Sequence, residues 1–197
     1  MTAVNRLLAY IRRVETGFDD MRAYDYMYGH KKIEPRLTQM TLREAIDRGA
    51  QWTKQHGSSA AGAYQFMRAT LLDLMRTHNL PETLPMTPDT QDYLATLLLR
   101  RRGLDDFLEG KIRVVDFARR LAQEWASLPV LEPCQGAHRY LQRGQSYYAG
   151  DGMNKALVPA MEFETFLHSL RQQEPEPQPE PVNFWTWLLS ILRRFFS

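Results

Sequence analysis

Residues 172–182 read QQEPEPQPEPV and divide the chain into two unequal parts. Each proline lacks a backbone N–H donor and fixes φ, so this run cannot continue a helix or enter the middle of a sheet. We expect an extended, solvated linker. The chain is therefore predicted to consist of a domain of residues 1–171, a Pro/Glu-rich linker of residues 172–182 and a tail of residues 183–197.

The composition of the chain excludes several classes of protein. A domain of residues 1–171 is long enough to bury a core without covalent staples. Cys134 is the only cysteine, so neither an internal disulfide nor a cysteine-based metal site can form. The five histidines show no HxxxH or HxH spacing, which argues against a zinc peptidase or amidase. We expect no metal and no organic cofactor.

The net charge is small, because 25 Lys and Arg residues face 23 Asp and Glu residues, giving +2. This balance does not indicate a nucleic-acid partner.

The first residues, MTAVNRLLAYIRRVE, lack the uninterrupted apolar stretch and small-residue cleavage site of a signal peptide. We expect synthesis in a host cytoplasm without a signal peptide, and a monomeric protein.

Hydrophobic residues of the domain recur mainly at helical spacing. Gly17 is placed to end the first helix, and the sequence from Thr41 to Glu44 is a capping box. The Tyr-rich stretch 22–37 is the best candidate for a small hairpin. The expected fold class is α+β and predominantly α, with helices over residues 3–15, 41–57, 67–78, 87–102, 114–127 and 159–171.

Glu15 is the first candidate for chemistry. It ends the first predicted helix and lies between apolar Val14 and Phe18. A carboxylate at a helix end is usually solvated or part of a cap. Apolar flanks, however, raise the pKa of a carboxyl group by desolvation. A glutamic acid that stays protonated near neutral pH can act as a general acid.

Two further segments combine glycine, small residues and aromatic rings. Ser-Ser-Ala-Ala-Gly-Ala leads into Tyr64 and Gln65, which offer a ring face and an amide to a sugar. The alternative is a tight turn with Tyr64 in the core. Residues 144–152 place Tyr147 and Tyr148 among three glycines, which suits a loop lining a cleft. An ordinary surface loop with half-buried aromatics is the alternative there.

Together these segments resemble the lambda-type phage endolysins, lytic transglycosylases of the lysozyme-like superfamily. Roughly residues 1–171 carry the resemblance, and the pieces occur in the order of that family. They are Glu15-Thr-Gly after the first helix, Tyr24-Asp25 with Gly29 in the Tyr-rich stretch, the Ser-Ala-Ala-Gly-Ala-Tyr-Gln run that ends at Gln65, and Trp-Ala-Ser-Leu-Pro over residues 125–129.

The resemblance implies a lysozyme-like fold with Glu15 as the only catalytic acid and base. It places Tyr64 and Gln65 in a saccharide cleft, with Tyr24 and Asp25 as further substrate-binding candidates. The run from Tyr147 to Gly150 is similar to the Tyr-Asn-Ala-Gly motif of cellular lytic transglycosylases, with Tyr148 in place of Asn. The resemblance places Tyr147 near the scissile sugar, with Tyr148 as a further substrate-binding candidate.

The number of carboxylates separates two glycan-cleaving reactions. A glycoside hydrolase normally uses two carboxyl groups, about 5–9.5 Å apart depending on stereochemistry. A lytic transglycosylase needs only Glu15, because the muramoyl 6-hydroxyl attacks C1 and leaves a 1,6-anhydro sugar. The alternative is a hydrolytic muramidase in which Asp19, Asp20 or Asp25 assists. A protein without catalysis, which binds glycan or disrupts membranes, is a third hypothesis.

The tail NFWTWLLSILRRFFS carries a broad apolar face and a narrow polar stripe. Fifteen residues of helix reach about 22 Å, less than the roughly 30 Å of a bilayer core. Aromatic residues, leucines and two arginines instead favour a helix lying at a membrane interface. The alternative is docking on an apolar groove of the domain. The expected membrane-binding residues are Phe184, Trp185, Trp187, Leu188, Ile191, Arg193 and Arg194.

Overall fold

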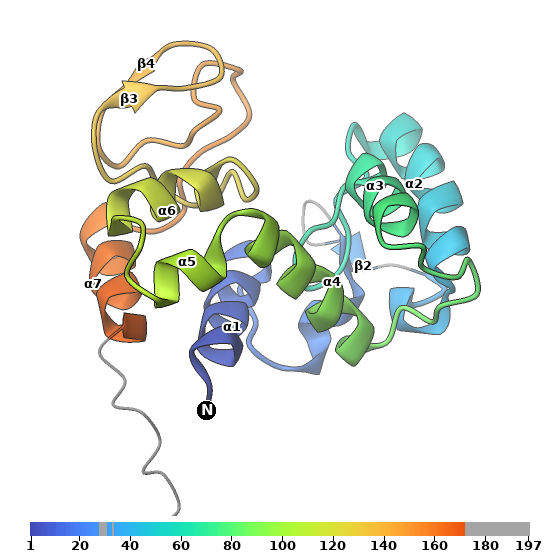
Figure 1. Ribbon diagram of the computed structural model, residues 1–197. Coiled ribbons are helices and arrows are strands. Elements are labelled where there is room, and N and C mark those ends of the chain that lie inside the picture. Colours follow the sequence, from blue (N-terminus) through green and yellow to red (C-terminus); the bar gives the residue numbers. More distant parts are fainter. Residues whose placement is uncertain (28–30, 33, 172–197) are drawn as a thin grey trace, which may run out of the picture.

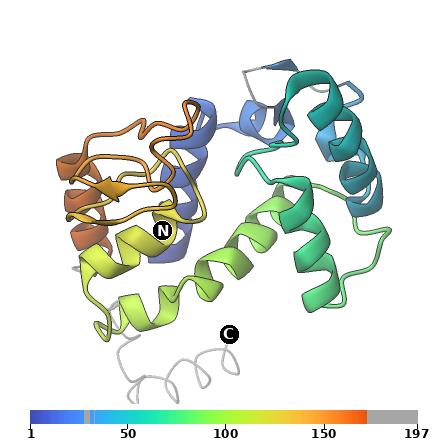
Figure 2. The same ribbon diagram turned by 90° about the horizontal axis from the view of Figure 1, so that it is seen from above.

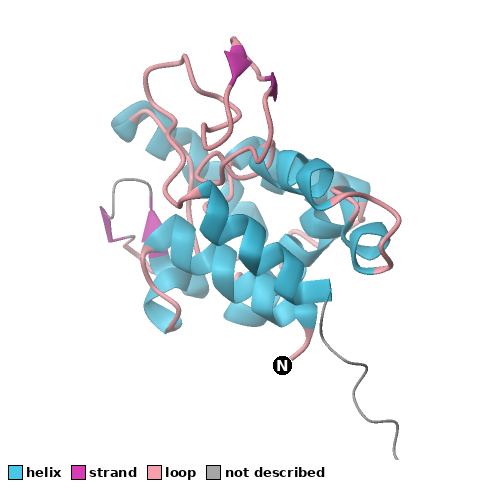
Figure 3. Ribbon diagram, turned by 90° about the vertical axis from the view of Figure 1, so that its left-hand side faces the viewer, coloured by secondary structure: helices cyan, strands magenta, loops and turns pink. Residues whose placement is uncertain are grey.

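The computed structural model describes residues 1–27, 31–32 and 34–171. Helices make up most of this part of the chain, and two short antiparallel hairpins complete it (Figure 3). The predicted fold class, α+β and predominantly α, is therefore confirmed. The predicted linker and tail, including the seven proposed membrane-binding residues, lie outside the described residues.

Helix α1 (Ala3–Thr16) occupies the middle of the molecule and packs against α4 and α7 (Figure 1). Thr2 caps its start, where its hydroxyl accepts a hydrogen bond from Asn5 N at 3.2 Å. Leu7 and Ile11 face the core with no exposed surface. The helix ends at Gly17, which takes a left-handed conformation with φ 78° and donates its N–H to Arg13 O. The predicted stop at this glycine is confirmed.

The remaining helices form two lobes on either side of α1 (Figures 1 and 2). Helices α2 (Leu42–His56) and α3 (Arg68–Thr77) pack together in one lobe. The capping box at the start of α2 is present with both of its hydrogen bonds. Helix α4 (Pro88–Arg101) leads to the second lobe, which contains α5 (Leu104–Leu108), α6 (Val114–Ala122), α7 (Ala160–Arg171) and a hairpin.

Each lobe contributes one hairpin. In the first, β1 (Tyr26–Met27) pairs with β2 (Lys31–Lys32), which confirms the hairpin predicted within residues 22–37. A 3₁₀ turn, η1 (Met21–Asp25), precedes it, and another, η3 (Leu37–Gln39), follows it. In the second lobe, β3 (Cys134–Gln135) pairs with β4 (Tyr140–Leu141). Cys134 is buried there as a free thiol.

The predicted boundaries hold for most helices, but the helix predicted over residues 114–127 is too long. Helix α6 ends at Ala122, and Trp125 and Leu128 then form tight turns stabilised by backbone hydrogen bonds to Leu121 and Trp125. Two elements were not predicted, the short helix α5 and the hairpin of β3 and β4. Among the described residues, no helix combines the length and the apolar character needed to cross a membrane.

Candidate active site

Glu15 lies in the last turn of α1 and retains only partial exposure. Its Oε1 accepts a hydrogen bond from the hydroxyl of Ser127. Desolvation by burial raises the pKa of Glu15 from 4.5 to about 7, and the hydrogen bond from Ser127 acts in the opposite direction. Near neutral pH, a large fraction of the Glu15 carboxyl groups is therefore protonated.

The segment Trp125–Pro129 brings Ser127 to Glu15 and connects three parts of the site. The indole of Trp125 is buried and donates Nε1–H to the carbonyl of Tyr64 at 3.2 Å. Ser127 O accepts from Leu157 N at 2.8 Å. Ser146 donates its hydroxyl to Ala126 O at 2.7 Å. The segment thereby ties the end of α1 to the Tyr64 turn and to residues 144–152.

The turn before α3 holds Gln65 in an unusual backbone conformation. Gln65 has φ 48°, a left-handed value that is uncommon for residues other than glycine. Its amide Nε2 donates to Gly62 O at 2.8 Å, and the N–H of Gly62 donates to Tyr26 O at 2.6 Å. Gly62 itself has φ 77°, and a Cβ atom there would collide with the side chain of Gln91. Close backbone packing thus fixes Gln65, whose side chain is partly exposed.

Tyr24 and Tyr64 belong to a buried polar network. Asp92 Oδ1 accepts a hydrogen bond from Tyr64 at 2.6 Å and from Tyr24 at 2.8 Å. Arg12 donates to the hydroxyls of Tyr24 at 2.7 Å and Tyr64 at 3.3 Å, and its Nη1 lies 3.7 Å from Asp92. Tyr64 is 1% exposed. This burial agrees with the alternative interpretation of the sequence, a tight turn with Tyr64 in the core.

The two phenol groups of this network resist ionisation. Burial is the largest cause, and the adjacent Asp92 carboxylate adds to it. Together they raise the pKa of Tyr24 to about 12 and raise the pKa of Tyr64 further. Both hydroxyls therefore stay protonated as donors to Asp92. Arg12 Nε is the one deeply buried side-chain nitrogen or oxygen of the described chain without a hydrogen-bond partner.

Tyr147 and Tyr148 are both half-buried, with their rings edge to face at 5.3 Å. The hydroxyl of Tyr148 donates to Gln123 O at 2.7 Å, so this group is engaged within the protein. The backbone of Tyr147 is fixed, because its carbonyl accepts from Ala137 N at 3.0 Å. Tyr147 packs against the core, and no hydrogen bond joins its hydroxyl to the described part of the chain. These positions distinguish the two tyrosines, which the sequence alone could not do.

The three aspartates considered as second carboxylates lie in different surroundings. Asp25 accepts from the backbone N–H of Thr38 at 2.8 Å and from its hydroxyl at 3.2 Å. Asp20 binds Arg22 through both carboxylate oxygens, and these hydrogen bonds lower its pKa. Asp19 lines a groove between α1 and α7. The carboxylates of Asp25 and Asp20 are therefore engaged by partners other than Glu15, and Asp19 lies at the groove.

A desolvated carboxyl group that can be protonated near neutral pH, held in a helical domain, is typical of an enzyme that uses acid–base catalysis. A family model described as Endolysin matches residues 8–153, about three quarters of the chain, so the chain belongs to the Endolysin family. Membership makes it a phage enzyme that degrades peptidoglycan in host lysis. A comparison with curated proteins and another with solved structures each gave no match.

Sequence reasoning did not single out Arg12, Gln91, Asp92 or the individual role of Ser127. The Trp-Ala-Ser-Leu-Pro motif contained Ser127, so its presence in a recognised motif was an available signal. Gln91 is fully buried and bridges Ala63 N with the carbonyls of Tyr24 and Met86. In the sequence of α4, Gln91 does not clearly interrupt the pattern of apolar residues, so nothing there indicated that it is buried.

Proposed function

We propose that the chain is a lytic transglycosylase of the lambda type, with Glu15 as its single acid and base. Protonated Glu15 donates to the oxygen between N-acetylmuramic acid and N-acetylglucosamine. The resulting carboxylate takes the proton of the muramoyl 6-hydroxyl as that oxygen attacks C1. The products are a 1,6-anhydromuramic acid end and a free 4-hydroxyl on N-acetylglucosamine, and no water is consumed.

The observation that carries this proposal is the protonation state of Glu15. Its pKa of about 7 makes it both a competent acid and, after transfer, a competent base near neutral pH. The attacking hydroxyl belongs to the substrate, so its effective concentration is high without a second protein group. The hydrogen bonds of Asp25 to Thr38 and of Asp20 to Arg22 support a mechanism in which neither aspartate activates water.

The proposed substrate contacts divide by exposure. Gln65 and Tyr147 are partly exposed and are proposed to touch the saccharide directly. Tyr148 is proposed to border the same cleft with its ring while its hydroxyl holds Gln123 O. Tyr24 and Tyr64 are buried, so we propose that they support the cleft through Asp92, and Asp25 through its hold on Thr38.

Mass spectrometry of muropeptides released from purified sacculi tests the reaction. A transglycosylase yields anhydro-muropeptides. They are lighter than hydrolysis products by about 18 Da, the mass of the one water that hydrolysis adds across the glycosidic bond. Reducing ends that incorporate ¹⁸O from labelled water would establish the muramidase instead. Absence of any released muropeptide would leave a glycan-binding protein.

Substitution of Asp25 by Asn separates the two reactions within the same assay. Asp25 is the aspartate closest in sequence to the hairpin that borders Gln65 through Tyr26. The transglycosylase mechanism predicts substantial turnover in Asp25→Asn, and equally in Asp19→Asn and Asp20→Asn. Any one of these three variants that is folded and as inactive as Glu15→Gln would favour the muramidase.

We further propose that residues 183–197 bind a membrane surface after the enzyme leaves the cytoplasm to act on the cell wall. Burial of Trp185, Trp187 and the neighbouring leucines would supply most of the affinity, and Arg193 and Arg194 would add attraction to anionic headgroups. Co-sedimentation with anionic vesicles tests this. Deletion of residues 172–197 should abolish vesicle binding and leave cleavage of membrane-free sacculi nearly unchanged.

A further inference from the structure

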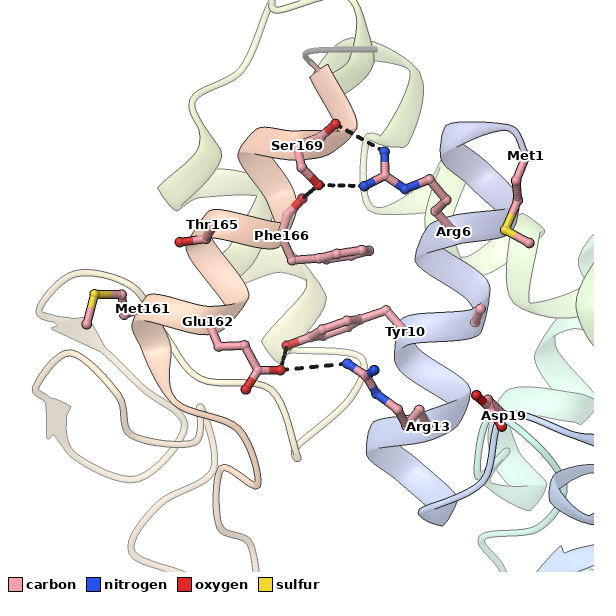
Figure 4. Close-up of a pocket in the computed structure, with 11 residues that line it drawn as sticks. Met1, Arg6, Tyr10, Arg13, Asp19, Met161, Glu162, Thr165, Phe166 and Ser169 are labelled. Atoms are coloured by element: carbon pink, nitrogen blue, oxygen red, sulfur yellow. Dashed lines mark hydrogen bonds and ion pairs between the residues drawn. The ribbon is translucent and has the colours of Figure 1, made fainter.

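A groove of about 540 Å³ runs between α1 and α7 (Figure 4). Arg13 lines it, and Glu15 lies two residues later, about 200° around the helix. The floor of the groove is apolar, with the rings of Tyr10 and Phe166 stacked at 4.1 Å beside Ala9. Met161 forms part of the rim and is 74% exposed.

The described chain leaves α7 at one end of this groove. Ser169, in the last turn of α7, lines that end together with Arg6, which donates to its carbonyl at 3.2 Å and its hydroxyl at 2.7 Å. Residues 172–182 follow directly. Eleven residues of a Pro-rich run extend to about 34 Å, more than a chain needs to reverse beside a helix.

The tail matches the groove in length and in apolar character. Helix α7 has 12 residues and is therefore about 18 Å long, and a helix of residues 183–197 would be about 22 Å long. The tail sequence places Phe184, Leu188, Ile191 and Phe195 at helical spacing. Such a face can cover the exposed edges of the groove and remove its own apolar surface from water.

The charges at the two ends of the groove favour one direction of docking. Glu162 and Asp19 lie at the end opposite Ser169, and the Glu162 carboxylate is half exposed beside Arg13 (Figure 4). Arg193 and Arg194 fall near the end of the tail, so a tail antiparallel to α7 brings them to these carboxylates. The glutamates of the linker would then pass beside Arg6.

We propose that residues 183–197 fold back as a helix in the α1–α7 groove of their own chain, antiparallel to α7. The groove is then the resting site of the tail in water, and the membrane binding proposed above requires its release. The inference itself rests on the groove and the tail, not on the proposed catalytic reaction.

Disulfide formation between paired cysteines in the full-length protein tests this placement. One variant combines Met161→Cys with Leu192→Cys. The matched control combines Met67→Cys, at the start of α3 in the other lobe and 46% exposed, with the same Leu192→Cys. Cys134 is buried and is retained in both variants. Without vesicles and under a mild oxidant, the first pair should close at least ten times faster than the control, at a rate independent of protein concentration.

A blocking substitution makes the result independent of the reach of the linker. Ala9→Lys places a long cation on the floor of the groove and should slow closure of the Met161→Cys, Leu192→Cys pair to the rate of the control. Circular dichroism and thermal unfolding check its fold, and Thr165→Lys, at an exposed position that lines the same groove, takes its place if this variant is unstable. Equal closure rates for the two pairs would overturn the proposal. Closure that accelerates with protein concentration would overturn it in favour of exchange of tails between two copies.

Discussion

Two partly exposed acids, Glu15 on α1 and Asp92 on α4, lie close to α1 and are held in opposite ways. Glu15 receives a hydrogen bond from the neutral hydroxyl of Ser127, and no ion pair joins it to a described cationic residue. Asp92 receives two tyrosine hydroxyls and lies 3.7 Å from the guanidinium of Arg12. Arg12 and Glu15 are only three residues apart on α1.

The difference shows what each acid can do. A buried carboxyl group without a cation is neutral until the pH approaches its raised pKa, so it holds a proton that it can give to a substrate. A carboxylate with a cation and two phenols has its charge matched, and it fixes the elements around it. The Arg12 network therefore anchors α1 to Tyr24, Tyr64 and α4, while Glu15 remains free to exchange a proton.

The largest effect is expected from Glu15→Gln. The amide keeps the shape of the side chain but cannot donate an acid proton, so release of muropeptides should fall about a thousand-fold or more. Binding to sacculi should stay near that of the wild type, and so should the thermal unfolding temperature at pH 4, where Glu15 is largely protonated in both the folded and the unfolded state. Activity within tenfold of the wild type would remove Glu15 from the proposed role.

The second effect concerns stability and pH. The pKa of Glu15 is raised in the folded protein, so the folded state binds more protons than the unfolded state between pH 4.5 and about 7. The free energy of unfolding of the wild type should therefore decrease as the pH rises through this range. The Glu15→Gln variant has no titrating group at this position, so it should not show this decrease. Relative to the wild type, the variant should gain about 3 kcal/mol between pH 4 and pH 8, measured by urea denaturation. Parallel pH profiles would contradict the burial of a neutral Glu15.

The third prediction concerns the hydrogen-bond network around Asp92 and Arg12. Asp92→Asn leaves the buried Arg12 guanidinium without its anion, and it should lower the free energy of unfolding by about 2 kcal/mol, a value reduced for the partial exposure of Asp92. Activity per folded molecule should fall far less than in Glu15→Gln. Asp89→Asn, on the exposed surface of the same helix, is the control and should change stability little. A Glu15-like loss of activity in a stable Asp92→Asn protein would show that the network takes part in chemistry.

The smallest effect is expected from Ser127→Ala. The hydroxyl of Ser127 lowers the pKa of Glu15, so its removal should raise that pKa further. The alkaline fall in activity, which follows loss of the Glu15 proton, should then move to higher pH in a kcat/KM profile. Ser59→Ala, which removes a different buried hydroxyl bonded to Arg68 N, should leave the profile in place. A shift toward lower pH would contradict the assigned direction.

Local patterns in the sequence were sufficient for most of the fold. The capping box at Thr41 and the glycine after α1 act within one or two turns of helix, so their effects can be read from neighbouring residues. The end of α6 could not be read in this way. Its last predicted turn is replaced by tight turns that carry Ser127 to Glu15, a contact between residues 112 positions apart.

The candidate site was predictable where its proposed chemistry has a local signature. Glu15 could be chosen from its apolar neighbours and from the resemblance, and its environment in the structure has the expected character. Tyr64 shows the limit of such reasoning, because the same small-residue run suits a sugar cleft and a buried turn. Only the contacts with Asp92 and Arg12, from two other helices, place its ring in the core.

The position of Glu15 in the final turn of α1 has an electrostatic consequence for the second half of the proposed reaction. Peptide dipoles along a helix add up to a partial negative charge at its carboxyl end, which disfavours a nearby anion by about 0.3–1 kcal/mol. A carboxylate formed there by proton loss faces this field in addition to its desolvation. The direction of α1 therefore drives the group back toward its neutral form, and each catalytic cycle would return the enzyme to its starting charge.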